Sequence, residues 1–217
     1  MKKLFALLLA AMMILSFAAC SDDKKTDTDP TKVSFEAPDP DDVTTATITR
    51  GKVNGNTYTN ASAGISFTLP SGWRFYSDSE LASLINSAVD VLNDEGFNAA
   101  LDSTGTVYDM MALNTTTNEN VMIVFENTKK TLGKDLTPTE YVNTVKSQLA
   151  PMGYVFSTVS NATLGGHSYV QASALASTNG VNLEQYYYCR SIDNYLVSII
   201  TTSNGNTSSG ELAALFN

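Results

Sequence analysis

The chain has 217 residues and a formal net charge of −9, and 43% of its residues are hydrophobic. This length leaves room for one domain after a leader and a linker, and the apolar content is ordinary for a globular protein. The acidic balance argues against nucleic-acid binding, because phosphate backbones repel such a surface, and against electrostatic docking on anionic lipid.

Residues 1–19 have the form of a secretory signal peptide. Two lysines open the segment, and residues 4–15 are almost purely apolar but too short for a bilayer span, which needs roughly 20 residues. Small residues then lead to Cys20, and this pattern resembles a bacterial lipoprotein signal, although Phe17 stands where that family usually has leucine. The alternative is an ordinary signal peptide cut near Ala19. The position of Cys20 at the end of the apolar run favours the lipoprotein signal.

The lipoprotein resemblance implies that the sulfur of Cys20 receives diacylglycerol and that cleavage makes Cys20 the new N-terminus. Two acyl chains on one residue give stable membrane attachment, so we expect a lipid-anchored protein on the extracytoplasmic face of the cell membrane. Cys189, the second of two cysteines, then has no partner within the chain. We therefore expect no intrachain disulfide.

Residues 20–42 are rich in Asp, Thr, Lys and Pro and contain almost nothing to bury. Such a composition cannot offset the entropy of ordering, so we predict a disordered acidic linker. Residues 43–217 are predicted to form a single globular domain, and we expect it to be monomeric.

The domain is predicted to open with a hairpin whose second strand is its organising element. Thr57–Thr59 forms the first strand, after a turn at residues 54–56. Residues 65–69 then alternate apolar and polar side chains, as in a half-buried strand. Pro70 and Gly72 end that strand. We expect Trp73 to turn back into the core and to pack on the helix that follows.

Three helices are predicted from capping boxes, in which a Ser or Thr side chain and a Glu three residues later cap each other's backbone. The boxes are Ser77–Glu80, Thr137–Glu140 and Ser208–Glu211. The first helix is predicted to run to residue 92 and to end at residues 93–96, with a short helical turn at residues 97–101. Its apolar face has the spacing of an amphipathic helix and comprises Leu81, Leu84, Ile85, Ala88, Val89 and Leu92.

The remaining segments are predicted to be strands joined by hairpins, which imply an antiparallel sheet. The continuous apolar run at residues 121–125 indicates a central strand covered on both faces. The other predicted strands are residues 107–113, 154–162, 167–176, 181–191 and 195–201. The fold class is therefore α+β, as an α/β/α sandwich with a central, mainly antiparallel sheet.

The pattern Tyr58-x5-Gly64-Ile-x-Phe-x-x-Pro70-x-Gly72-Trp73, followed by a helix and later strands, resembles the PsbP-like fold. That family includes photosystem extrinsic subunits, a nuclear Ran-binding protein and many small bacterial lipoproteins. The resemblance covers about residues 54–217 and implies a non-enzymatic domain that binds or assembles partners. It carries over no functional residue, because family members share a scaffold and not a site.

The sequence contains no Gly-x-Ser-x-Gly motif, phosphate loop, Cys-x-x-Cys motif or metal-ligand spacing. His167 has no second His or Cys nearby in sequence to suggest a metal site. We therefore predict no catalytic residue, metal or cofactor, and a non-catalytic binding or assembly domain. The alternative is a cell-surface hydrolase of an unrecognised family, which converging carboxylates or His167 in a deep cleft would favour.

Tyr186, Tyr188 and Arg190 share one face of a predicted strand, and Tyr187 and Cys189 share the other. An exposed Tyr/Tyr/Arg row suits contact with a protein or glycan partner. The favoured alternative is that these tyrosines pack beneath a helix with their hydroxyl groups at the rim.

Overall fold

The computed structural model of the chain describes residues 48–84, 94–178 and 180–217. The expectations for residues 1–19, Cys20 and the linker 20–42 lie outside these residues, as does the second half of the helix predicted after Ser77. None of the described helices is both long and apolar enough to cross a membrane.

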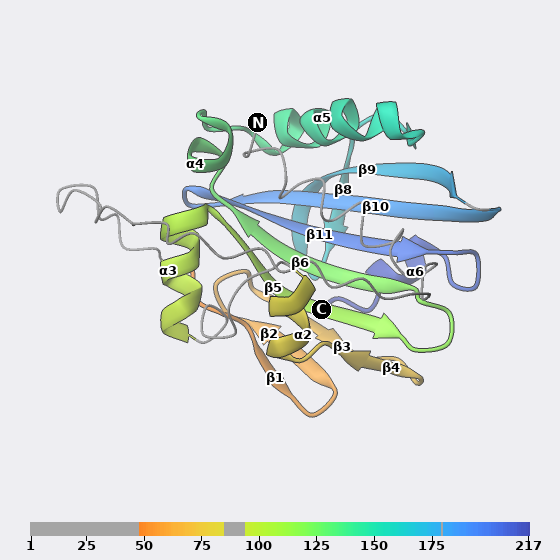
Figure 1. The fold of residues 1–217 in the computed structure, drawn as a ribbon, viewed down its shortest axis with the longest axis horizontal. Helices are drawn as coiled ribbons and strands as arrows, with labels where there is room; N and C mark the ends of the chain where they lie inside the picture. The colour runs from red at the N-terminus through yellow and green to blue at the C-terminus, as the bar shows by residue number, and fades with distance from the viewer. Residues whose placement is uncertain (1–47, 85–93, 179) are drawn as a thin grey trace, which may run out of the picture.

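Two antiparallel sheets organise the described residues (Figure 1). The small sheet has three strands in the order β1-β2-β3; the large sheet has eight, in the order β4-β5-β6-β11-β10-β9-β7, with β8 also paired to β9. The strands are β1 (Lys52–Asn54), β2 (Thr57–Asn60), β3 (Ile65–Thr68), β4 (Trp73–Phe75), β5 (Thr106–Asn114), β6 (Asn120–Glu126), β7 (Val155–Phe156), β8 (Ser160–Leu164), β9 (His167–Thr178), β10 (Val181–Ile192) and β11 (Tyr195–Ser203).

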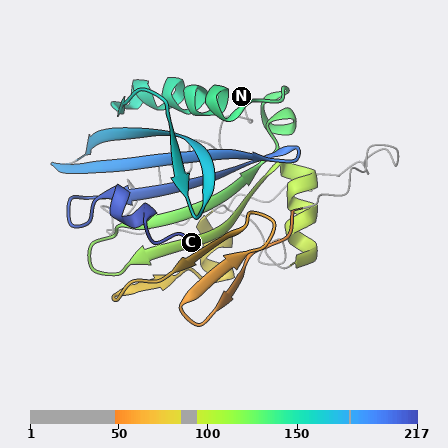
Figure 2. The same cartoon turned by 180° about the vertical axis from the view of Figure 1, so that it is seen from behind.

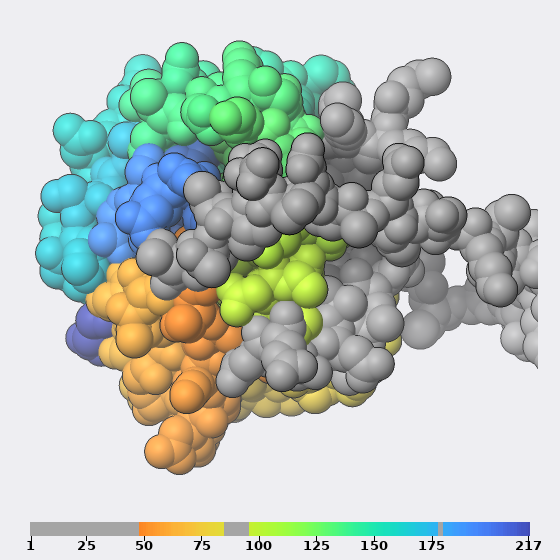
Figure 3. Space-filling model, turned by 90° about the vertical axis from the view of Figure 1, so that its left-hand side faces the viewer, coloured from red at the N-terminus to blue at the C-terminus, as the bar shows by residue number. Residues whose placement is uncertain are grey.

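Short helices connect and cover these strands. They are α2 (Asp78–Leu84), α3 (Asp94–Thr104), α4 (Thr128–Leu132), α5 (Pro138–Leu149), the 3₁₀ helix η3 (Ala150–Met152) and α6 (Ser209–Ala213). Figure 1 shows α5 lying along β9 and β10. Figure 2, the view from behind, shows the small sheet and α6 in front of the large sheet. Figure 3 shows the surface of the small sheet (orange) next to that of α3 (yellow-green).

The large sheet is buried on both faces. The front core packs α2 and α5 on one face, and the back core packs the small sheet, α3 and α6 on the other. Successive residues of β10 show the two faces, since Tyr187 belongs to the front core and Tyr188 to the back core. The fold is therefore α+β, as predicted. The predicted sandwich had helices alone in both outer layers, whereas here a small sheet forms much of the back layer.

Several elements were predicted correctly from local sequence signals. β2 pairs with β3 as the predicted hairpin, and β6 lies between β5 and β11 with all seven residues buried. All three capping boxes form: in α5, for example, the Thr137 side chain accepts from the Glu140 backbone, and the Glu140 side chain accepts from the Thr137 backbone.

Two local predictions were wrong, and one helix was missed. Residues 94–96 open α3 and do not end a helix, because Phe97, Ala100 and Leu101 at helical spacing are buried in the back core. The strand predicted at residues 154–162 is interrupted between β7 and β8, where the backbone and hydroxyl group of Ser157 bond to the backbone of Ser173. Helix α4 was not predicted at all; the Asn127 side chain caps it by accepting from the Lys130 amide.

The prediction for Trp73 was half right. Pro70 to Trp73 forms a tight turn, with the Trp73 amide donating to the Pro70 carbonyl at 3.2 Å. Trp73 then opens β4, is only partly buried, and packs on the back core. Leu81 of α2 belongs to the front core. The prediction that Trp73 packs on the first helix was therefore wrong.

Candidate functional site

An open groove of about 780 Å³ lies where the small sheet approaches β4 and the start of α2. Residues 50–53 form one wall, residues 74–78, 80 and 81 form the other, and the buried Asp109 and Met110 of β5 lie at the floor. The volume falls within the range of sites that hold small ligands. We therefore treat the groove as the candidate functional site.

An irregularity in β5 places the floor residue Asp109. Val107 belongs to the back core and Tyr108 to the front core, as strand alternation requires. The register with β6 then shifts between Tyr108 and Met110, so that Met110 joins the back core while Asp109 also contacts the small sheet. A bulge of this kind re-aims a side chain, and bulges are frequent beside functional sites.

Asp109 is 5% exposed and is held by three donors. The Gly51 amide lies 3.0 Å from each carboxylate oxygen, the Asn60 amide nitrogen lies 2.9 Å from Oδ2, and the Tyr58 hydroxyl also donates to Oδ2. Burial raises the pKa of Asp109, and these three donors offset part of that rise. The network joins the start of the described chain, the small sheet and the large sheet.

Gly51 is required by the close approach of the Tyr58 ring. A Cβ atom at residue 51 would lie 2.2 Å from a ring carbon of Tyr58, which no side chain tolerates without movement. Glycine therefore lets the backbone amide reach the Asp109 carboxylate past the aromatic ring.

Two arginine–carboxylate pairs form the rim of the groove. Arg50 donates two hydrogen bonds to Asp78, and Arg74 donates two to Glu80 at 2.9 and 2.7 Å. The Arg74 hydrogen bonds and the Ser77 amide lower the pKa of Glu80 to about 2. Both arginines thus have a fixed, bidentate carboxylate partner.

A second, shallower hollow of about 490 Å³ adjoins the groove. The two share Arg74, Tyr76 and Glu80, and the second continues to Ser79, Ser83 and Leu84 of α2. The Arg74 guanidinium carbon lies 5.0 Å from the centre of the Tyr76 ring. We call these three shared residues the ridge.

The residues that the sequence analysis considered as partner contacts, Tyr186, Tyr188 and Arg190, lie outside the groove. Tyr188 is 4% exposed and stacks on the partly buried Tyr186, with ring centroids 6.0 Å apart. Arg190 is partly buried, donates to the Ala63 carbonyl, and lies 5.3 Å from the centre of the Tyr169 ring. The row is therefore not an open surface. The tyrosines pack in the back core, as the favoured alternative held, and α6 belongs to the same core and contacts β10.

The remaining singled-out residues are also outside the groove. Nε2 of His167 lies 2.9 Å from the Gly64 carbonyl oxygen. Cys189 is a buried free cysteine in the front core. Among the described residues, no three His, Cys, Asp or Glu side chains come together as a set that could hold a metal ion.

Sequence reasoning missed Asp109, Arg74 and Tyr76. Asp109 is the charged residue within a strand of otherwise buried apolar residues, and that contrast is the signal that could have found it. Arg74 and Tyr76 stand in the short connection between Trp73 and the first helix. No sequence pattern there indicates that the connection lines a groove.

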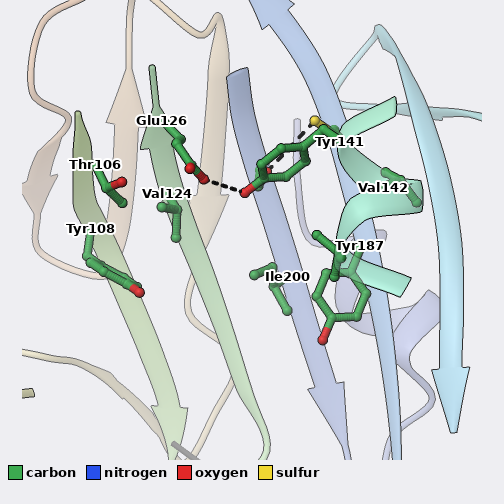
Figure 4. Close-up of a pocket in the computed structure, with 11 residues that line it drawn as sticks. Thr106, Tyr108, Val124, Glu126, Tyr141, Val142, Tyr187 and Ile200 are labelled. Atoms are coloured by element: carbon green, nitrogen blue, oxygen red, sulfur yellow. Dashed lines mark hydrogen bonds between the residues drawn. The ribbon is translucent and has the colours of Figure 1, made fainter. Parts of the chain in front are cut away.

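A second buried polar cluster lies beneath α5 (Figure 4). The Glu126 carboxylate is 2% exposed and accepts hydrogen bonds from the Thr131 hydroxyl at 2.6 Å and the Tyr141 hydroxyl at 2.8 Å. Glu126 lines a small cavity of about 20 Å³, together with Ser198 and Cys189. Burial raises the pKa of Glu126. The cavity is large enough for about one water molecule and no larger ligand.

No protein-family model matches the sequence, and no curated protein matches it. Among solved structures, the chain is similar to a Bacteroides thetaiotaomicron protein at 12% identity and a TM-score of 0.41, over 76% of this chain and 48% of that one. It is similar to LpqN of Mycobacterium tuberculosis, described as involved in cell envelope biogenesis, at 16% identity and a TM-score of 0.36, over 64% of this chain and 68% of that one.

A Pseudomonas aeruginosa protein of unknown function, PA94, is similar at 13% identity and a TM-score of 0.30, over 46% of this chain and 67% of that one. The chain spans about half the length of the Bacteroides protein. At these TM-scores, none of the similarities supports a statement about function.

Proposed function

We propose that this chain is a lipid-anchored protein of the cell envelope whose domain binds a partner in the groove above Asp109, without catalysing a reaction. The anchor is Cys20, and the support for it is the apolar run that ends in small residues before that cysteine. The domain then faces the extracytoplasmic side, where it meets envelope components.

The groove is the observation that carries the binding role. It combines a volume typical of ligand sites with charged and aromatic side chains held in place by hydrogen bonds. A preorganised rim loses little side-chain freedom when a ligand binds, and this lowers the cost of binding.

The alternative is a surface hydrolase, and the groove does gather three carboxylates: Asp78, Glu80 and Asp109. Each one is already engaged. Asp78 and Glu80 hold arginines, and Asp109 is buried beneath three donors. A general acid must hold a proton near the working pH and reach the substrate. The pKa of Glu80 is lowered to about 2, and Asp109, whose pKa is raised, is only 5% exposed and points its oxygens at three donors of the chain. These features favour binding over hydrolysis.

The PsbP-like assignment is part of the same proposal. Its support is the sequence motif from Tyr58 to Trp73, which forms a hairpin and a tight turn as expected. A binding or assembly role is what that resemblance implies. The proposal assigns the role to the groove, since the family resemblance itself provides no site.

Site-specific photo-crosslinking in cells tests this function. A photoreactive amino acid replaces Lys52, an exposed residue of the groove wall, in the full-length lipidated chain. The matched control replaces Lys129, an exposed lysine on α4 away from the groove. We expect a discrete crosslinked product from residue 52 and none from residue 129. Equal crosslinking from both positions, or none from residue 52, contradicts a binding groove.

A further inference from the structure

The groove and the second hollow together form a bipartite surface. The ridge of Arg74, Tyr76 and Glu80 lines both hollows, so a ligand that crosses it contacts both. A compact ligand needs one hollow only. Two adjoining hollows that share the ridge instead suit an extended chain that lies across it.

The charges of the bipartite surface balance. Arg50, Lys52 and Arg74 supply three positive charges. Asp78, Glu80 and Asp109 supply three carboxylates. Both arginines are already paired with carboxylates, in a chain whose net charge is −9. Neither a polyanion nor a polycation gains a net attraction here, so the charge favours a neutral ligand.

The hydrogen-bonding groups of the surface both donate and accept. A guanidinium has five N–H groups, and a carboxylate has about four lone-pair sites. The Arg50–Asp78 pair therefore retains both donors and acceptors after its two mutual bonds. Arg74 retains N–H groups after its bonds to Glu80 and the Phe75 carbonyl, whereas Arg74 and Ser77 already occupy the lone pairs of Glu80. The hydroxyl groups of Ser77 and Ser83 already donate, to Glu80 and to the Ser79 carbonyl, and the Ser83 oxygen retains acceptor capacity toward a ligand. A ligand covered with hydroxyl groups matches such a surface, because each hydroxyl group donates one hydrogen bond and accepts others.

We propose that the bipartite surface binds a neutral oligosaccharide chain laid across the ridge, with sugar units in both hollows. This inference rests on the proposed binding function and names its ligand class. Arg74 is the central contact, since it lies over the Tyr76 ring and lines both hollows. An extended peptide is the competing occupant.

Calorimetric titration of the full-length protein in detergent with neutral tetrasaccharides tests the inference. The probes are chitotetraose, cellotetraose and maltotetraose, with their monosaccharides and tetra-alanine for comparison. We expect at least one tetrasaccharide to bind, and to bind at least about tenfold more tightly than its monosaccharide, because it fills both hollows. Binding of tetra-alanine alone, or of no tetrasaccharide, overturns the inference.

Two variants locate the binding. Arg74→Ala removes the ridge guanidinium from an exposed position, and we expect about a tenfold loss of tetrasaccharide affinity. Ser83→Trp fills the second hollow from an exposed helix position, and we expect it to reduce the tetrasaccharide's advantage over the monosaccharide. Lys129→Ala removes one positive charge elsewhere and serves as the control. Equal affinities for wild type and both groove variants overturn the inference.

The failure of this inference is distinguishable from that of the proposed function. Groove-specific crosslinking at residue 52, combined with no tetrasaccharide binding, leaves the binding function standing and removes the ligand class. Absence of that crosslinking removes the binding function itself.

Discussion

Tyr58 donates a hydrogen bond to Asp109, and this bond joins β2 of the small sheet to β5 of the large sheet. Both side chains are buried, Tyr58 at 1% exposure and Asp109 at 5%. The bond lies at the bulge of β5 and beneath the groove. The same residues therefore hold the two sheets together and fix the floor of the candidate site.

Replacement of Asp109 by Asn should destabilise the domain by about 1–3 kcal/mol, because the variant retains one acceptor for three buried donors. The check is urea unfolding followed by circular dichroism. Tyr58→Phe removes a single donor and should cost less than Asp109→Asn. If Asp109→Asn unfolds at the same urea concentration as wild type, the network does not join the sheets.

The buried Glu126 should make stability depend on pH. Burial raises its pKa above the unfolded value of about 4.3. Its contribution to stability is therefore fully present below that value and is lost as pH rises through the folded pKa. The groups that face it are Tyr108 from β5, Thr131 from α4, Tyr141 from α5 and Cys189 from β10, and none of them is a cation.

Melting temperatures of wild type and Glu126→Gln from about pH 4 to about pH 8 isolate this contribution, since Gln resembles the protonated acid. Wild type should lose stability relative to the variant as pH rises. Burial also raises the pKa of Asp109. Asp109 is present in both proteins, so its effect cancels in the comparison. Parallel pH profiles for the two proteins would count against a proton on Glu126.

The capping box of α5 should contribute about 1 kcal/mol to stability. Thr137→Ala removes the side chain that accepts from the Glu140 amide. Thr139→Ala, an exposed substitution in the first turn of the same helix, provides a matched control without a cap. Chemical unfolding should show a loss for Thr137→Ala that Thr139→Ala lacks, and equal effects of the two would argue against the cap.

Trp73 should report a half-buried environment. Because it packs on the back core while remaining partly exposed, we expect intermediate emission and partial quenching by iodide. Trp73→Ala should cost about 2 kcal/mol, below the range for a fully buried tryptophan. Emission like that of free indole, with no loss of stability in the variant, would mean that the ring makes no core contact.

The predictable parts of this fold are those that depend on neighbours in sequence. The Thr137–Glu140 box and the apolar run at residues 121–125 each contain their own signal, and both formed as predicted. Of helix α3, only a turn at residues 97–101 was predicted, because its full extent depends on burial of Phe97 and Leu101 against a distant sheet. Tertiary packing there outweighs the glycine at residue 96.

The candidate site was not predictable in the same way, because its residues are distant in sequence. Asp109 meets Gly51 and Tyr58 only through the pairing of two sheets and a register shift in β5. The Tyr186, Tyr188 and Arg190 row was correctly placed on one strand face. The sequence could not show that the back core covers that face.

The central claim is that the groove binds an envelope partner, and the most direct test is the crosslinked fraction at residue 52 with and without Arg74. The full-length chain carries the photoreactive group at residue 52, either with Arg74 or with Arg74→Ala, and the crosslinked fraction is quantified from intact cells. We predict a clear fall in that fraction in the Arg74→Ala chain at equal protein abundance. An unchanged fraction would contradict the claim.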